Sequence, residues 1–222
     1  MSWASTRAYF EHINRIVQQR MDRRTSAPLL IETLDFSHIH PPRTENDWQL
    51  TAEMLADSAK RLEAAGAEAL IIGANSMHRV FELVASAVQL PILHIATSVG
   101  ERMAADGVKL AAVLGTRSVM TESFYRRRLV THGIDLLPPE ASDVELLDRM
   151  IYDELMLGRA TREAERALKS IIANLEKQGA QAVVLAATEL EQVVDVDANV
   201  LPIYDSTHTH ARTAAEWILG NG

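Results

Sequence analysis

The sequence contains no cysteine in its 222 residues. Disulfides, thiolate nucleophiles and metal sites built on cysteine are therefore excluded. Long apolar runs are also missing, and no stretch approaches the length that a membrane-spanning helix needs. The chain opens with MSWASTRAYF, which is polar and helical in pattern and does not resemble a signal peptide. We therefore expect a cytoplasmic protein without a membrane partner.

Basic residues are few compared with acidic ones, at 22 Lys and Arg against 30 Asp and Glu, which gives a net charge of −8. Because phosphate binding needs a basic face, we expect no nucleic-acid partner. A small acidic ligand is still compatible with this charge, since a local site can be positive inside an acidic protein. Hydrophobic residues make up 47% of the chain, enough for one large or two small globular domains.

The chain contains an internal repeat that organises the rest of the sequence. Residues 61–77, RLEAAGAEALIIGANSM, recur 113 positions later as residues 174–190, NLEKQGAQAVVLAATEL, with Gly66 and Gly179 aligned. Each copy predicts an amphipathic helix that ends at the glycine and is followed by a short buried parallel strand. Ligands of open α/β sheets sit at the carboxyl ends of strands. Two such ends predict one site built between two similar lobes.

The remaining sequence alternates between helical and strand patterns, which predicts an α/β fold with parallel sheets covered on both sides. We expect two parallel-sheet lobes related by pseudo-twofold symmetry, with a ligand cleft between them. Residues 1–97 and 207–222 form the first lobe of this prediction, and residues 98–206 form the second. A first helix, capped by Ser2 or Ser5, precedes the others. The predicted strands are 27–36, 69–72, 91–95, 109–114, 134–137, 182–186 and 201–204, and the later helices are 47–65, 77–88, 99–106, 121–132, 144–157, 161–178 and 208–219.

The two predicted lobes differ at their beginnings. The second starts with a strand at residues 110–114, whereas the first starts directly with a helix. By the internal symmetry, the first lobe lacks its opening strand. Either Met1 is an internal methionine of a longer reading frame, or the protein does without that strand.

Several short motifs are spread over nearly the whole chain, and together they resemble the aspartate/glutamate racemase superfamily of cofactor-independent amino-acid racemases. The resemblance is closest to the branch with broad amino-acid specificity. The matching pieces are Met1-Ser2-Trp3-Ala4-Ser5-Thr6, Pro42-Arg43-Thr44, Asn75-Ser76-Met77-His78, Leu114-Gly115-Thr116, Ala187-Thr188-Glu189, and Asp205 with His210.

The resemblance implies a mechanism with two bases, one on each side of the substrate α-carbon, and it implies a homodimer that needs no cofactor or metal. In that family both bases are thiolates. Here the motifs and the repeat both place the two bases at Ala74 and Ala187. A methyl group can neither accept nor donate a proton, so ordinary two-cysteine racemisation is excluded.

Short polar residues at the strand ends are candidates for binding the carboxylate of a small amino acid or dicarboxylate. Asn75, Ser76 and Thr188 offer amide, hydroxyl and backbone donors, although Ser76 and Thr188 could equally be helix caps. Thr116 is a similar candidate. Arg43 lies in a proline-rich loop, where its guanidinium either clamps a carboxylate or is a solvated surface group.

Two ionisable residues near the alanine positions are candidates for proton transfer. His78 could act as an acid or base near neutral pH, or it could be a structural histidine at a helix start. Glu189 lies two residues beyond Ala187 and could act as a base, or it could hydrogen-bond the substrate amine or a loop. Asp205, His208 and His210 have the residue types of a metal site, but their spacing matches no known ligand pattern, so we expect no metal.

Three functional hypotheses follow from the sequence. The first is a divergent member of the racemase family that carries out an isomerase, lyase or cyclase step on a small carboxylate, with Glu189 or His78 handling the proton. The second is a non-catalytic amino-acid-binding protein, which alanine at both Ala74 and Ala187 would favour. The third is a purely structural subunit, which predicts no ligand at all.

Overall fold

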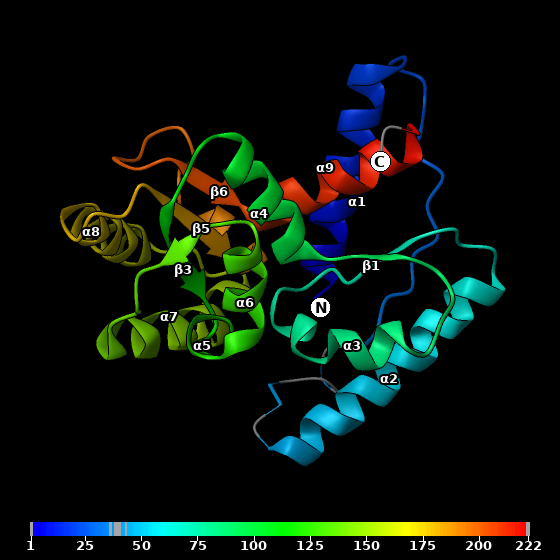
Figure 1. Ribbon diagram of the computed structural model, residues 1–222, viewed down its shortest axis with the longest axis horizontal. Coiled ribbons are helices and arrows are strands. Elements are labelled where there is room, and N and C mark those ends of the chain that lie inside the picture. Colours follow the sequence, from blue (N-terminus) through cyan, green and yellow to red (C-terminus); the bar gives the residue numbers. More distant parts are fainter. Residues whose placement is uncertain (1, 36, 38–40, 43, 221–222) are drawn as a thin grey trace. The chain divides into compact units, whose positions relative to one another are not determined.

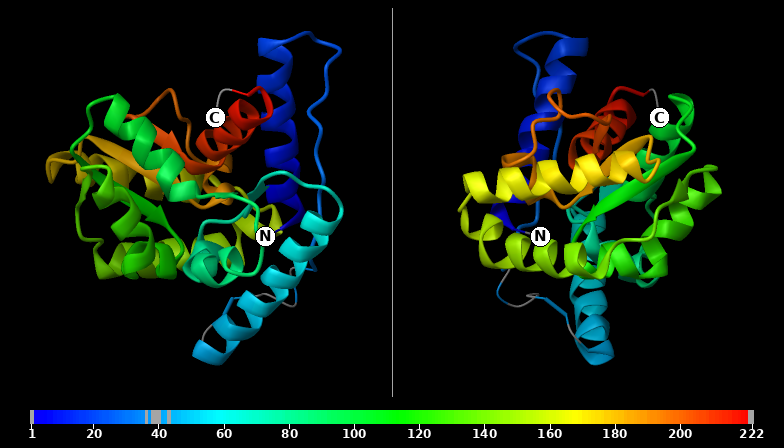
Figure 2. Two further views of the ribbon diagram at one scale, coloured as in Figure 1. Left: turned by 45° about the vertical axis from the view of Figure 1, so that its right-hand side comes forward. Right: turned by 90° about the vertical axis from the view of Figure 1, so that its left-hand side faces the viewer.

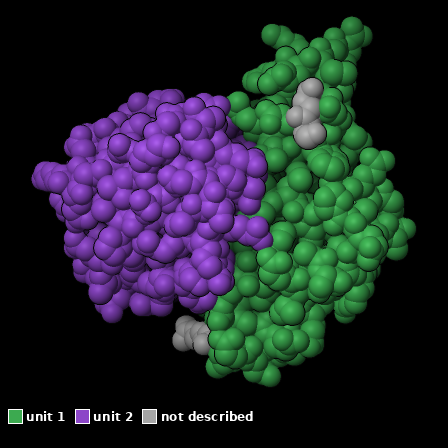
Figure 3. Space-filling model, in the orientation of Figure 1, with its two compact units in different colours: residues 1–94, 210–222 green, residues 95–209 purple. Residues whose placement is uncertain are grey.

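The computed structural model describes residues 2–35, 37, 41–42 and 44–220. The chain divides into two compact units, shown in Figure 3. Unit 1 comprises residues 1–94 and 210–222, and unit 2 comprises residues 95–209. Each unit carries a parallel β-sheet with helices packed beside it, so the predicted α/β class with two parallel sheets is confirmed (Figure 1).

Unit 2 is built on a four-stranded parallel sheet with the order β4-β3-β5-β6. The strands are β3 (Leu110–Gly115), β4 (Asp135–Leu136), β5 (Ala182–Ala186) and β6 (Ile203–Asp205). The central strands β3 and β5 pair over five residues, from Ala111 with Ala182 to Gly115 with Ala186. Both are apolar throughout and almost entirely buried, as expected for parallel strands covered on two faces.

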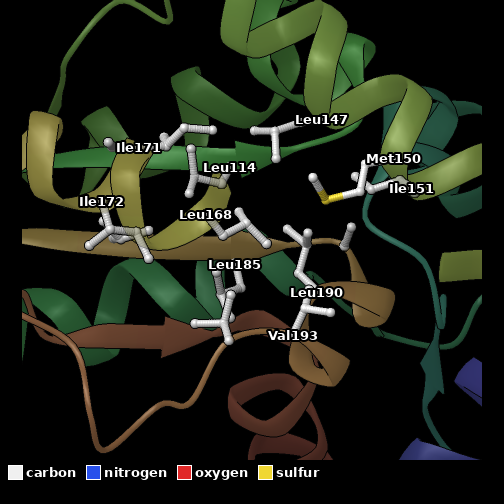
Figure 4. Packing of buried hydrophobic residues seen from close by; sticks show 14 of the residues in the cluster. Leu114, Leu147, Met150, Ile151, Leu168, Ile171, Ile172, Leu185, Leu190 and Val193 are labelled. Atoms are coloured by element: carbon white, nitrogen blue, oxygen red, sulfur yellow. The ribbon is translucent and has the colours of Figure 1, made fainter. Parts of the chain in front are cut away.

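Helices cover both faces of the unit 2 sheet (Figure 2). Side chains of β3 alternate between the two faces, because successive residues of a strand point to opposite sides. Val113 packs in the cluster formed with α4 (Ile95–Ala105) and α6 (Ser123–Thr131). Leu114 packs in the other cluster, with α7 (Ala141–Asp153) and α8 (Arg162–Lys177). Figure 4 shows this second cluster, in which Leu168 and Ile172 of α8 meet Leu185 of β5.

Unit 1 has a smaller sheet of two parallel strands, β1 (Leu70–Ile71) and β2 (Ile92–Leu93). The hydroxyl of Ser2 accepts a hydrogen bond from the backbone of Ser5, so α1 (Trp3–Arg20) begins with a side-chain cap. A reciprocal capping box between Thr44 and Asp47 begins α2 (Glu45–Ala64). The shorter elements are α5 (Arg117–Thr121) and η3 (Leu155–Leu157) in unit 2, and η2 (Ser76–Val80) and α3 (Phe81–Ala85) in unit 1. The last helix, α9 (Ser206–Ile218), begins in unit 2 and continues in unit 1.

The predicted strand at residues 27–36 is wrong for the described residues 27–35, which follow an irregular path without strand pairing. Phe36 lies outside the described residues. An apolar run becomes a strand only when another strand lies alongside to accept and donate its backbone hydrogen bonds. Within the described part of unit 1, β1 and β2 pair only with each other, and the 27–35 segment has no such neighbour.

The internal repeat is preserved in the backbone of the two units. Gly66 and Gly179 both adopt left-handed conformations, with φ of 92° and 95°, at the ends of α2 and α8. The following strands enter their sheets in the same way. The amide of Leu70 donates to the carbonyl of Pro91 at 2.9 Å, and that of Val183 donates to Pro202 at 2.9 Å.

Across the described ranges, every helix falls short of the combined length and hydropathy that crossing a membrane requires.

Candidate functional site

In unit 1, the chain turns from β1 into the short helix η2 at the first alanine position. The His78 side chain is 2% exposed, and its Nδ1 lies 2.9 Å from the carbonyl oxygen of Ala74. A carbonyl can only accept a hydrogen bond, so Nδ1 carries the proton in the neutral ring and Nε2 has the basic lone pair. An imidazole is thus fixed next to the position where the sequence predicts a missing base.

Three buried histidines of unit 1 form a cluster around this position. The ring centroid of His78 lies 4.5 Å from that of His94, which follows β2, and 5.9 Å from that of His210 in α9. Phe81 stacks on His78 with its ring centroid at 6.1 Å and also meets His94 at 4.6 Å. The cluster is assembled from three elements that lie far apart in the sequence.

His210 is a neutral ring of this cluster, and both of its nitrogens are hydrogen-bonded. Its Nε2 donates to the carbonyl of Leu93 at 2.9 Å, and its Nδ1 therefore accepts from the hydroxyl of Tyr9, also at 2.9 Å. Complete burial lowers the pKa of His210 to about 4. The ring is therefore uncharged at neutral pH.

In unit 2, the second alanine position follows β5 and leads into η4 (Thr188–Gln192). Ala187 and Thr188 are both buried. The hydroxyl of Thr207, in the first turn of α9, donates to the hydroxyl of Thr188 at 3.2 Å. Thr116 lies at the end of the neighbouring strand β3, with its hydroxyl 3.4 Å from that of Ser118. Hydroxyl groups therefore gather at the carboxyl ends of the central strands of this unit.

Glu189 follows Thr188 and is the buried acidic group of this end of unit 2, with 6% of its surface exposed. Burial raises the pKa of Tyr152 in α7, and the negative charges of Asp148 and Glu189 raise it further. The charge of Glu189 thus helps to keep the phenol of Tyr152 protonated. A buried carboxylate is costly unless nearby donors stabilise it.

The structure assigns the candidate residues of the sequence to two separate groups. Asn75, Ser76 and His78 lie in unit 1, whereas Thr116, Thr188 and Glu189 lie in unit 2. Arg43 lies outside the described residues. The expectation that Ser76 and Thr188 are helix caps is not met, because each is the first residue of its helix and the preceding residue is the cap. His78 lies within η2 and does not precede it.

Sequence reasoning missed Tyr9, His94, Tyr152 and Thr207. For His94, the repeat held a usable signal. Residues 91–94, PILH, and residues 202–205, PIYD, occupy the same place after the repeated strand, so His94 corresponds to Asp205, which the sequence motifs had singled out. Tyr9, Tyr152 and Thr207 belong to helices that lie far along the sequence from the residues they act on. No local sequence pattern predicts such long-range contacts.

Within the described ranges, no three His, Asp or Glu side chains are placed to hold a metal ion, and this includes Asp205, His208 and His210. Asp205 instead accepts a hydrogen bond from the backbone amide of His208 at 3.0 Å.

Comparison with known proteins gives a match to a family model, two similar solved structures and one protein that is similar in sequence. The family model described as Asp/Glu/hydantoin racemase matches residues 1–214. A candidate Asp/Glu racemase from Yersinia pestis shares 35% identity and a TM-score of 0.90, covering 99% of this chain and 96% of its own. An aspartate racemase homologue from Pyrococcus horikoshii shares 28% identity and a TM-score of 0.84, with 98% and 95% of the two chains covered. A broad-specificity amino-acid racemase of Bacillus subtilis is 23% identical over 165 residues, which span 74% of this chain and 71% of that protein.

Proposed function

Because the chain belongs to the Asp/Glu/hydantoin racemase family, we propose that it binds a small amino acid or dicarboxylate and moves a proton on it with groups other than cysteine. The observation that carries the proposal is the hydrogen bond between His78 Nδ1 and the carbonyl of Ala74. It fixes a titratable ring beside one of the two alanine positions. Glu189 is the buried ionisable group next to the other, Ala187.

His78 is the first candidate for the proton-transfer group. Its tautomer directs the lone pair of Nε2 away from the Ala74 carbonyl, so this nitrogen can take a proton from a carbon acid and return it. The stacked ring of Phe81 and the ring of His94 restrict the orientation of His78. A fixed orientation favours proton transfer because the ring needs little reorganisation during the step.

Glu189 is the second candidate, and it differs from His78 in charge. As a carboxylate it can accept a proton or hydrogen-bond the amino group of a substrate. Its negative charge is one cause of the raised pKa of Tyr152, after burial and Asp148. A histidine in one unit and a glutamate in the other are chemically unequal, which favours a step with one proton-transfer group over symmetrical two-base racemisation.

Each alanine position has hydrogen-bond donors that suit a carboxylate. Asn75 and Ser76 supply an amide and a hydroxyl in unit 1, and Thr116 and Thr188 supply hydroxyls in unit 2. The resemblance adds Arg43. These groups are neutral apart from the arginine, which suits a small carboxylate that is recognised mainly by hydrogen bonds.

The reaction class that fits one proton-transfer group is an isomerase, lyase or cyclase step at a carbon next to a carboxylate. The group removes a proton from that carbon, and the electron pair then either takes the proton back or expels a leaving group. In a decarboxylation the roles are reversed, because the protonated group delivers its proton to the carbanion left by carbon dioxide. None of these steps needs a cofactor.

A panel of amino acids and dicarboxylic acids incubated with the protein in heavy water and followed by proton NMR tests the proposal. Loss of an α-proton signal, or a new product, supports it. Binding of one compound, seen by line broadening and by a raised melting temperature, without any chemical change would favour a non-catalytic amino-acid-binding protein. Absence of both binding and chemistry would overturn both readings.

Assembly as a homodimer is part of the same proposal, since the family resemblance implies it. Light scattering on the purified protein measures it directly. A mass near twice 24.6 kDa supports a dimer, and a mass near 24.6 kDa contradicts it.

A further inference from the structure

Thr207, in the first turn of α9, uses its hydroxyl differently from several other helical threonines of this chain. The hydroxyls of Thr51, Thr121 and Thr209 each donate to the backbone carbonyl four residues earlier, at 2.7–2.8 Å. This local bond is common for a threonine in a helix. Thr207 donates instead to the side chain of Thr188 in η4, at 3.2 Å.

The hydrogen bond between these two threonines is buried. Thr207 is completely buried, and 9% of Thr188 is exposed. A buried hydroxyl is stable when it is hydrogen-bonded, and the bond to Thr188 satisfies this need for Thr207. The first turn of α9 is capped by Asp205, which accepts from the backbone amide of His208. The hydroxyl of Thr207 therefore serves Thr188 and not the helix that carries it.

The direction of this bond determines what the Thr188 hydroxyl can do. A hydroxyl group has one hydrogen to donate and two lone pairs that accept. Thr207 donates its hydrogen to a lone pair of Thr188, so Thr188 keeps its own hydrogen for another acceptor. Within the described ranges, the protein supplies no such acceptor. Thr188 directly follows Ala187, the second alanine position, so a bound ligand there is the partner that fits this hydrogen.

The internal repeat shows that the first alanine position has no equivalent of this bond. The strand pairs β1–β2 and β5–β6 have the same register in the repeat. Counting on from these strands aligns Ala96 with Thr207 and Asn75 with Thr188. A methyl group donates no hydrogen bond, so Ala96 cannot orient Asn75 as Thr207 orients Thr188.

We propose that Thr207 is a positioning residue, which holds the Thr188 hydroxyl as a hydrogen-bond donor for a carboxylate oxygen of the ligand. This inference rests on the proposed function, in which the ligand is a small carboxylate. A donor with a fixed direction needs little ordering when its acceptor binds. The bond from Thr207 also polarises the Thr188 hydroxyl, which strengthens the bond that this hydroxyl donates.

A donor held in this way distinguishes a carboxylate from an amide. Both oxygens of a carboxylate accept hydrogen bonds, whereas a carboxamide presents one acceptor and one donor group. A hydrogen bond to a charged acceptor is also stronger than one to a neutral acceptor. We therefore expect Thr207 to increase the preference of the protein for succinate over succinamide.

Titration of the wild type, Thr207→Val and Thr207→Ser with succinate and with L-aspartate tests the proposal. Valine keeps the shape of threonine and removes the hydroxyl, so the dissociation constant should rise by about fivefold to tenfold. Serine keeps the hydroxyl, so Thr207→Ser should bind within about twofold of the wild type. Binding of succinamide should differ little between the wild type and Thr207→Val.

A double-mutant cycle with Thr188→Val separates an effect that passes through Thr188 from a general loss of packing. When residue 188 is already valine, Thr207→Val should weaken succinate binding by less than about twofold, because the hydroxyl that it orients is gone. Additive losses would show that Thr207 affects the ligand by another route, and they would overturn the proposal.

Thr51→Val is the matched control. Thr51 is also buried and also donates its hydroxyl hydrogen, but its partner is the backbone carbonyl of Asp47. This variant should bind succinate as the wild type does. If Thr207→Val shows no cooperative thermal unfolding, Thr207→Ala removes the same hydroxyl without adding volume, and the same comparisons are made with it.

The outcomes distinguish this inference from the proposed function. Equal affinity of the wild type and Thr207→Val for both probes would overturn the inference alone. A loss in Thr207→Ser as large as that in Thr207→Val would also overturn it, because the hydroxyl would not be the cause. If neither probe binds the wild type but another compound of the panel undergoes proton exchange, the inference falls and the proposed function stands. If no compound binds or reacts, both fall.

Discussion

At the scale of single residues, the two alanines limit proton transfer to other side chains, because a methyl group can neither accept nor donate a proton. Ala74 and Ala187 stand at equivalent places of a repeat whose backbone is kept in both units. The polar side chains near them differ between the units, with His78 in one and Glu189 in the other. Hydrogen-bond donors and acceptors therefore lie near both alanines.

His210 gives a prediction about stability and pH. Its pKa is about 4 in the folded protein and about 6.5 in an unfolded chain, so the unfolded state binds more protons between these values. The stability from the neutral buried ring is complete above pH 6.5 and is lost as the pH falls towards 4. The loss amounts to about 3 kcal/mol. Urea unfolding of the wild type and of His210→Gln at pH 7 and pH 4.5 measures it.

The variant should be less stable than the wild type at pH 7, because Tyr9 loses its partner at Nδ1. Its free energy of unfolding should also vary less between the two pH values. An identical pH dependence in both proteins would show that His210 does not titrate as the structure indicates.

At the scale of elements, the sequence predicted best those segments whose pattern is sufficient by itself. The helix α8 and the strand β5 were predicted within a residue or so of their ends, because the apolar spacing, the cap Thr161 and the left-handed Gly179 all lie inside the segment. The strand at residues 27–36 was mispredicted for the described residues 27–35, because a strand also needs a neighbour that its own residues do not encode. His94 was missed although the repeat aligns it with Asp205, because its ring contact with His78 joins two different elements.

The two repeat glycines give a prediction at this scale. Gly66 and Gly179 have φ of 92° and 95°, and an added Cβ would meet nothing within 4 Å at either position. Alanine there is penalised by its backbone conformation and not by a clash, so Gly66→Ala and Gly179→Ala should each destabilise their unit by about 1–2 kcal/mol. Chemical denaturation measures both.

Gln178→Ala is the matched control, because this residue precedes Gly179 and has an ordinary right-handed conformation. It should change the free energy of unfolding by less than about 0.5 kcal/mol. A loss as large as that of Gly179→Ala would mean that the helix end and not the left-handed glycine is responsible.

At the scale of the whole molecule, the two units are unequally built. Unit 2 has a four-stranded sheet with an extensive apolar cluster on each face, whereas unit 1 has a sheet of two short strands beside an open cavity. Two-stranded sheets are only marginally stable without further support. The sequence predicted parallel strands in both units, but it did not indicate that a cavity lies beside β1.

Native-state hydrogen exchange should show the difference between the units. Amides of β3 and β5 should exchange only through global unfolding of unit 2, and those of β1 and β2 should exchange at least tenfold faster through local opening. The free energies of opening, obtained at several urea concentrations, compare them directly. Equal protection of both sheets would contradict this account of unit 1.

The central claim is that a non-cysteine group beside an alanine position transfers a proton. The measurement that tests it most directly is α-proton exchange in heavy water, for the compound that binds best, with the wild type, His78→Asn and Glu189→Gln. His132→Asn and Glu191→Gln serve as controls, one directly after α6 of unit 2 and one in the same short helix as Glu189. We expect exchange or product formation by the wild type and by both controls, and a loss of at least a hundredfold in one of the two test variants. Unchanged rates in both test variants, or binding by the wild type with no exchange and no product, would contradict it.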